Sequence, residues 1–146
     1  AREELIIRFI ELMPMGPLAH NWRERYVAEP EMWKQIRPLC REARPREHLA
    51  SAARYHDLTL DDGAPVRVGF ITAMSCPFCD SCNRIRITSD GAIYPCLFGE
   101  AEGNLLQALR PVFRPEQFDR VLAEALRKKA PEHDVTGVTI MTHIGG

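Results

Sequence analysis

Four cysteines lie within the stretch CPFCDSCNRIRITSDGAIYPC, residues 76–96. The first three are spaced C-x2-C-x2-C, and the fourth follows fourteen positions after the third. They are Cys76, Cys79, Cys82 and Cys96. Thiolates this close in sequence can reach one metal ion or cluster without strain, but the last cysteine has to be brought back by a turn of the chain. The segment is therefore expected to fold as a loop followed by a β-hairpin.

The hairpin register can be tested from the sequence. A three-residue loop at 89–91, with its glycine at positive φ, pairs Thr88 with Ala92 and sets Cys96 opposite Arg84. A two-residue turn would move every side chain of the returning strand by one position and turn Cys96 to the other face. A site shared by the cysteines on both strands therefore predicts the longer loop or a bulge.

The spacing of the cysteines suits a structural zinc site as well as an iron–sulfur cluster. Arg84 and Arg86 are two positions apart on an expected strand, so their side chains should share one face. Guanidinium groups beside thiolates can bind a polyanion, although surface arginines of no special function are common. The arginine pair favours iron–sulfur over zinc.

The composition excludes several classes of protein. The chain has 146 residues, 45% of them hydrophobic, which suffices for a domain with a real core. A net charge of −1 argues against a general nucleic-acid binder. No apolar run approaches the ~20 residues that span a bilayer. Five cysteines without a secretory signal indicate a reducing compartment, so we expect a cytoplasmic protein in which cysteines are metal ligands or buried thiols.

The apolar patterns alternate between strands and helices, which predicts the α+β class. We expect a strand buried on both faces at 5–12, a loop at 17–28, a helix from Glu29 that Pro38 kinks or ends, a polar connector at 43–48, strands at 49–58 and 66–74, the hairpin, a short helix at 103–109 and an amphipathic helix from Arg114. Cys40 lies on the apolar stripe of the first helix and is expected in the core.

Three segments together resemble one family. RFIELMPMG, CPFCDSCNRIRITSDGAIYPCLF and the terminal IGG are similar to the GTP 3′,8-cyclase family, radical S-adenosylmethionine enzymes of molybdenum cofactor biosynthesis. The resemblance runs from residue 5 to the last residue. It implies that Cys79, Cys82 and Cys96 hold an auxiliary 4Fe-4S cluster whose open iron binds the guanine of GTP. It also implies that Arg84, Ile85 and Arg86 contact the nucleotide.

Other matches to the family concern single positions. Met13 matches a position that contacts S-adenosylmethionine, although a core methionine is the commoner use of this residue. Gly145 and Gly146 match a double-glycine tail that enters the active site, although glycines at a chain end can also simply fray. Cys76 is outside the family pattern and is interpreted as a spare thiol, with a fourth metal ligand as the alternative.

The C-x3-C-x2-C motif that defines the family is absent from the sequence. The resemblance therefore implies a C-terminal portion: residues 1–16 as a late strand and loop of an incomplete (β/α) barrel, and residues 17–146 as an auxiliary-cluster and GTP-binding domain with a small, mostly antiparallel sheet. The second 4Fe-4S cluster, which cleaves S-adenosylmethionine, would belong to the N-terminal part, and the portion alone is expected to be inactive.

The complete enzyme would use a 5′-deoxyadenosyl radical to take hydrogen from the ribose C3′ of GTP, after which C3′ attacks guanine C8. Its product would pass to cyclic pyranopterin monophosphate synthase. Apolar surface around residues 5–12 makes a homodimer possible. Two alternatives remain: a four-cysteine zinc module that binds another macromolecule, and an auxiliary-cluster domain of a peptide-modifying radical enzyme.

Overall fold

The structure is a computed structural model that describes residues 5–46 and 51–133. The chain forms two compact units. The first comprises Ala1–Met13 and Asn21–Ser81, and the second comprises Pro14–His20 and Cys82–Gly146. Both helices and strands are present, so the predicted α+β class is confirmed. The predicted boundary after residue 16 refers to a barrel in a longer protein and stays a prediction.

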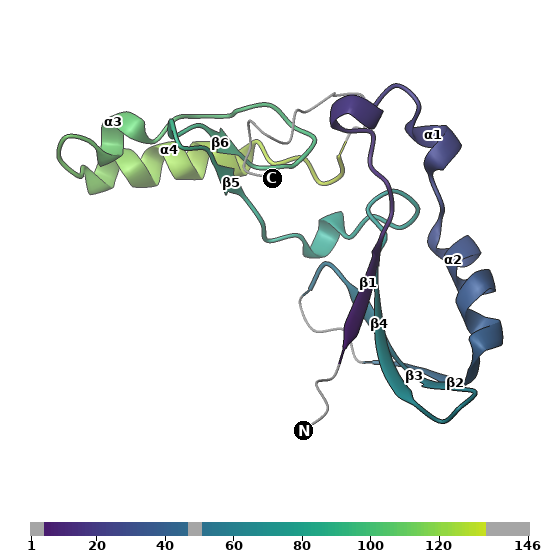
Figure 1. Cartoon of the computed structure of the whole chain (residues 1–146). Coiled ribbons are helices and arrows are strands. Elements are labelled where there is room, and N and C mark those ends of the chain that lie inside the picture. Colours follow the sequence, from purple (N-terminus) through teal and green to yellow (C-terminus); the bar gives the residue numbers. More distant parts are fainter. Residues whose placement is uncertain (1–4, 47–50, 134–146) are drawn as a thin grey trace. The chain divides into compact units, whose positions relative to one another are not determined.

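The first unit is built on a four-stranded sheet of order β1-β4-β3-β2 (Figure 1). Its elements are β1 (Ile6–Ile10), α1 (Trp22–Arg25), α2 (Glu29–Ile36), the 3-10 turn η2 (Arg37–Leu39), β2 (Cys40–Pro45), β3 (Arg54–Leu60), β4 (Pro65–Ile71) and the 3-10 turn η3 (Cys79–Ser81). β1 runs parallel to β4, and the other two pairs are antiparallel. The sheet is therefore mixed.

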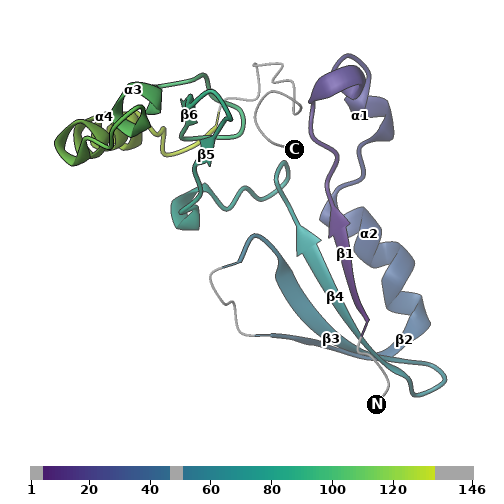
Figure 2. The ribbon, with the colours of Figure 1, turned by 60° about the vertical axis from the view of Figure 1, so that its left-hand side comes forward.

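Helix α2 covers one face of this sheet, as Figures 1 and 2 both show. The Trp33 ring lies 5.0 Å from the Phe70 ring, and the Phe9 ring stacks on Phe70 at 5.7 Å. Phe70 is 1% exposed, and burial of such a side chain contributes about 1.5–3 kcal/mol. Cys40 is 5% exposed in the same cluster, which confirms its predicted place in the core. Its predicted place on the helix was wrong, because α2 ends at Ile36 and Cys40 is the first residue of β2.

The prediction that strand 5–12 is buried on both faces was wrong. β1 is at the edge of the sheet and pairs with β4 alone, so its second edge has no strand beside it among the described residues. Ile6, Ile7 and Ile10 are exposed, Ile10 by 55%. The apolar run therefore forms a strand as predicted, but its isoleucine side chains leave an apolar surface exposed along β1.

Two other segments differ from the expectations. β2 includes the first half of the segment expected as a connector at 43–48. It pairs with β3 despite its polar side chains because its main chain supplies the hydrogen bonds. The segment expected as a loop at 17–28 contains most of the turn η1 (Gly16–Leu18) and all of α1. The strand expected at 49–58 lies at 54–60.

The second unit contains η1, a two-stranded sheet and two helices. These are β5 (Arg86–Ile87), β6 (Ile93–Tyr94), α3 (Leu106–Leu109) and α4 (Pro115–Arg127). Both helices were predicted. Ile93, Leu105 and Ala125 are fully buried, and Phe118 and Val121 of α4 pack against them. The amphipathic face of α4 therefore closes a small core over the hairpin.

The hairpin has the predicted three-residue loop. Gly91 has φ +86°, and the Thr88 N–H donates to the Ala92 carbonyl at 3.0 Å. A Cβ at Gly91 would lie 2.8 Å from the Leu106 main-chain nitrogen, so both conformation and space require glycine. The strand pairing ends at Arg86 and Tyr94, because the chain bends immediately after Tyr94.

Within residues 5–46 and 51–133, none of the helices combines the length and the apolar character needed to cross a membrane.

Candidate functional site

The segment that leads to the cysteines is anchored on the carboxylate of Glu11, just after β1. Glu11 is 1% exposed, and its Oε2 accepts the N–H groups of Met74 at 2.9 Å and Ser75 at 2.8 Å. Oε1 accepts the N–H of Glu29 at 3.0 Å and the Ser75 hydroxyl. Burial acts to raise the pKa of Glu11, but the hydrogen bonds from Ser75, Met74 and Glu29 together hold it below its usual 4.5. The carboxylate therefore stays charged and fixes the segment.

Cys76 and Cys79 follow this anchor in the first unit. The carbonyl of Cys76 accepts the Thr72 hydroxyl at 2.9 Å, and its exposed sulfur lies 3.5 Å from Arg54 Nη1. Arg54 also pairs with Glu29. Cys79 begins the turn η3 and is half-buried. The thiol outside the family pattern is thus the more accessible of the two.

Cys82 is the first residue of the longer segment of the second unit and lies beside two cationic side chains. The Lys129 ammonium donates to the Cys82 carbonyl at 2.7 Å and lies 3.5 Å from Cys82 Sγ. Partial burial acts to raise the pKa of Cys82, but hydrogen bonds from the Arg84 main chain and side chain and the charges of Lys129 and Arg84 outweigh it. The pKa of this thiol is therefore below its usual 9.0, and the thiolate, which is the metal-binding form, is favoured.

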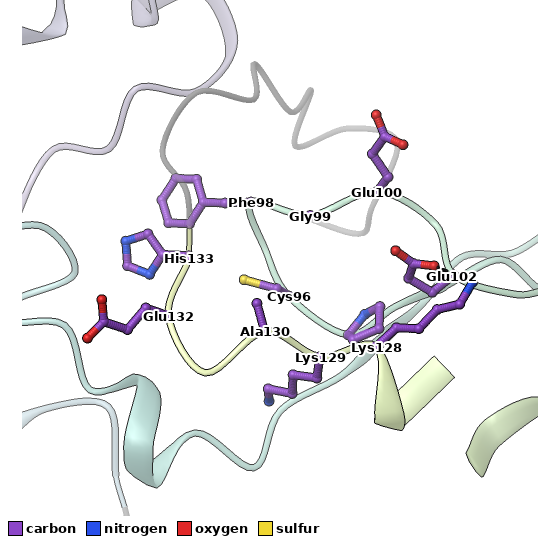
Figure 3. A pocket seen from close by; sticks show the side chains of 11 residues that line it. Cys96, Phe98, Gly99, Glu100, Glu102, Lys128, Lys129, Ala130, Glu132 and His133 are labelled. Carbon is purple, nitrogen blue, oxygen red and sulfur yellow. Dashed lines mark hydrogen bonds and ion pairs between the residues drawn. The ribbon is translucent and has the colours of Figure 1, made fainter. Parts of the chain in front are cut away.

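Cys96 lines a pocket of about 210 Å³ in the second unit (Figure 3). Its thiol points into the space between Ala130 and His133. On one side His133 stacks on Phe98, with ring centroids 4.6 Å apart. Lys129 also contributes to the lining. The pocket therefore combines a thiol and an aromatic wall with two lysines and three glutamates.

The nucleotide-contacting residues implied by the resemblance surround the start of the hairpin. Arg86 is the first residue of β5, opposite Tyr94, and is half-buried. Arg84 is exposed and Ile85 half-buried. Arg84 hydrogen-bonds to Cys82 through both its main chain and its side chain, so a fixed positive charge lies beside this cysteine.

The remaining predicted site residues are less informative. Met13 is half-buried and follows the end of β1 by three residues. Gly145 and Gly146 lie outside the described residues.

The structure thus brings Cys82, Arg84 and Lys129 together and places Cys96 in a pocket that Lys129 also lines. Within the described ranges, which include all five cysteines, there is no disulfide, and no three side chains of His, Cys, Asp or Glu form a metal-binding group. Cys79 belongs to the other unit. The three-cysteine set therefore stays a prediction.

The chemistry of the donors fits the implied cluster. Soft thiolates bind iron–sulfur clusters and zinc, and both Cys82 and Cys96 present half-buried sulfurs, the first of them favoured as a thiolate. Sequence reasoning missed Lys129 and Glu11. Glu11 could have been noticed as the single acid inside the apolar run RFIELM.

Comparison with known proteins identifies the family. The family model Molybdenum Cofactor Synthesis C matches residues 5–135. The chain belongs to this family. The matched range includes the segment anchored by Glu11, the hairpin and α4. The predicted resemblance is confirmed.

Relatives of this chain carry the name GTP 3′,8-cyclase. The protein of Alkaliphilus oremlandii is 38% identical over 130 residues, which cover 88% of this chain and 38% of the relative. That of Alkaliphilus metalliredigens is 39% identical over 130 residues, 87% of this chain and 37% of the relative. That of Moorella thermoacetica is 36% identical over 153 aligned positions, 100% of this chain and 46% of the relative. The chain thus spans less than half the length of each of these curated relatives.

Proposed function

We propose that this chain is the substrate-binding part of a GTP 3′,8-cyclase, the enzyme that converts GTP to a cyclic intermediate of molybdenum cofactor biosynthesis. The observation that carries the proposal is the pairing of Cys82 with cations: Lys129 lies 3.5 Å from its sulfur, and Arg84 bonds to it. A thiolate surrounded by fixed positive charge suits a site for a metal cluster beside a polyanionic nucleotide. The relatives are named GTP 3′,8-cyclase, which supports GTP as that nucleotide.

In this proposal Cys79, Cys82 and Cys96 hold the auxiliary 4Fe-4S cluster. The cluster supplies, when bound, an iron without a cysteine ligand at which guanine can bind. Cys82 precedes β5 and Cys96 follows β6, so the two cysteines lie on the open side of the hairpin whose register the loop at 89–91 fixes.

The arginines bind and orient the nucleotide. Arg84 and Arg86 are two positions apart at the start of the hairpin, and their guanidinium groups can donate to phosphate oxygens or to the base. Ile85 packs beside the ligand. Holding both ends of a substrate fixes the position of its ribose, which a hydrogen abstraction requires.

The remaining parts belong to the complete enzyme. Residues 1–16 contribute a strand of an incomplete barrel, Met13 contacts S-adenosylmethionine, and Gly145 and Gly146 enter the active site. A second 4Fe-4S cluster cleaves S-adenosylmethionine, so this 146-residue chain alone does not turn over GTP. The enzyme is cytoplasmic, can form a homodimer, and hands its product to cyclic pyranopterin monophosphate synthase.

The test is anaerobic reconstitution of the chain with iron and sulfide, followed by titration with isotope-labelled GTP and detection by EPR and ENDOR. We expect a spectral change and a coupling to guanine nitrogen, and neither with CTP. A chain that instead holds one tight zinc on four thiolates and does not respond to GTP would reject the proposal and support a zinc-binding interaction module.

A further inference from the structure

Lys129 lies two residues beyond the last residue of α4, and its ammonium contacts the segment from Cys82 to Arg84 that leads into β5. It donates to the carbonyl of Cys82 at 2.7 Å and to the carbonyl of Arg84 at 2.9 Å. The Cys82 sulfur is the third neighbour, at 3.5 Å. A lysine ammonium has three N–H donors, so these three acceptors can use all of them.

Its neighbour Lys128 has a different environment. Lys128 pairs with Glu102 at 2.9 Å, and its side chain is 61% exposed. The two adjacent lysines thus have separate partners, and only Lys129 is half-buried. A general preference for cations at the end of a helix would not distinguish them.

We infer that Lys129 is a positioning residue for the metal-ligand segment, which it holds by both carbonyls that flank Asn83 while its charge faces the Cys82 sulfur. The two carbonyls belong to the cysteine and to the first arginine, so one side chain sets the distance between the metal ligand and the cation that binds the nucleotide. Lys128 and Lys129 both line the pocket into which Cys96 points (Figure 3). The contacts with Cys82 and Arg84 are what distinguish Lys129 from its neighbour.

The expected effect of Lys129 on metal binding follows from the repulsion between thiolate ligands that are brought close together. A cluster bound by thiolates carries net negative charge, and a fixed ammonium beside one sulfur offsets part of it. Groups in the second shell of a metal site that orient a ligand typically change metal affinity by about 10–100-fold. Lys129 can do both: its hydrogen bond to the Cys82 carbonyl orients the ligand residue, and its positive charge offsets part of the negative charge of the cluster.

This inference rests on the proposed function, because Cys82 is taken as a ligand. The test is a titration of the metal-free chain with Co(II), followed through the sulfur-to-cobalt absorption band. The variants are Lys129→Met, Lys129→Arg and the matched control Lys128→Met. We expect Lys129→Met to weaken Co(II) binding by about 10–100-fold, Lys129→Arg to recover most of the affinity, and Lys128→Met to leave it unchanged.

Circular dichroism of each variant shows whether the fold is kept. Should Lys129→Met fail to fold, Lys129→Gln replaces it, because glutamine keeps a donor for one carbonyl and removes the charge. Equal affinity for wild type and the neutral variant would overturn the inference and leave the proposed function standing. A wild-type chain with no cobalt–sulfur band would overturn the proposed metal site itself. Equal losses in the Lys129 and Lys128 variants would also overturn the inference, because the effect would then be one of overall charge.

Discussion

Ser75 makes two hydrogen bonds to the carboxylate of Glu11, one from its main-chain N–H at 2.8 Å and one from its hydroxyl. The two residues are sixty-four positions apart. The contact joins the end of β1 to the segment that leads to Cys76 and Cys79. The geometry of the first cysteines therefore depends on a buried charge in a distant part of the sequence.

Replacement of Glu11 by glutamine should destabilise the first unit by about 3 kcal/mol, because an amide cannot accept at both positions and buried donors lose their partners. Urea unfolding followed by tryptophan fluorescence measures this, since Trp22 and Trp33 both lie in the first unit. The matched control is Glu31→Gln, whose exposed pair with Lys34 should contribute less than about 0.5 kcal/mol. Equal effects would contradict the anchoring role of Glu11.

The contribution of Glu11 should depend on pH. Its pKa in the folded chain is below 4.5, so unfolding at mildly acidic pH is accompanied by proton uptake. The stabilisation is complete above the unfolded pKa and is lost as the pH falls through the folded pKa. We expect the difference in unfolding free energy between wild type and Glu11→Gln to be constant at neutral pH and to shrink below about pH 4.5. A difference that grows on acidification would be inconsistent with a charged Glu11.

Gly91→Ala should destabilise the β5–β6 hairpin more than Gly63→Ala destabilises the turn between β3 and β4. Both glycines have φ +86°, but a Cβ at Gly63 meets nothing within 4 Å, whereas at Gly91 it meets Leu106 N at 2.8 Å. The conformational cost is about 1–2 kcal/mol at each position, and Gly91 adds the collision. Hydrogen exchange of the Thr88 and Gly91 amides, which donate to the Ala92 and Thr88 carbonyls, reports on the hairpin. Unchanged protection in Gly91→Ala would show that the loop can relax.

Cys76→Ser should leave the iron content of the reconstituted chain unchanged, while serine at Cys79, Cys82 or Cys96 should reduce it strongly. Cys76 is exposed and its sulfur lies beside Arg54, outside the proposed ligand set. Iron and sulfide analysis after anaerobic reconstitution measures this. Loss of iron in the Cys76 variant would identify a fourth thiolate ligand and a closed site.

Arg84→Ala and Arg86→Ala should each weaken GTP binding to the reconstituted chain by about 10–100-fold, the size expected for a lost charge-assisted hydrogen bond. Lysine at either position should restore only part of the GTP affinity, because an ammonium group cannot make the bidentate pair that a guanidinium makes with a phosphate. Calorimetric titration with GTP is the measurement. Arg127→Ala, at the exposed end of α4, is the control. A similar loss in the control would indicate a general charge effect.

Local signals in the sequence sufficed for the hairpin and for α4. The loop length followed from one glycine and the need to bring Cys96 to the right face, and α4 followed from the spacing of Phe118, Val121 and Leu122. Both elements depend mainly on residues close in sequence. Their prediction therefore did not require knowledge of the tertiary structure.

The elements that were missed depend on distant partners. β2 has the polar sequence CREARP and forms a strand because its main chain hydrogen-bonds to the main chain of β3. The roles of Glu11 and Lys129 are invisible for the same reason, since their partners are up to sixty-four and forty-seven positions away. A lone charged residue in a sequence does not disclose what it will contact.

The residues of the candidate site likewise include some that the sequence disclosed and one that it did not. The spacing of the cysteines and the arginine pair were visible in the sequence, and they led to the family. The cation beside Cys82 was not visible, because Lys129 is the last of three consecutive basic residues at the end of α4 and resembles an ordinary helix end.

The division of the chain into units has a consequence for how such a protein can change by recombination. The second unit includes Pro14–His20, which are flanked in sequence on both sides by residues of the first. No single crossover point can therefore transfer either unit whole to another gene. Transfer of the second unit would require two separate segments, Pro14–His20 and Cys82–Gly146.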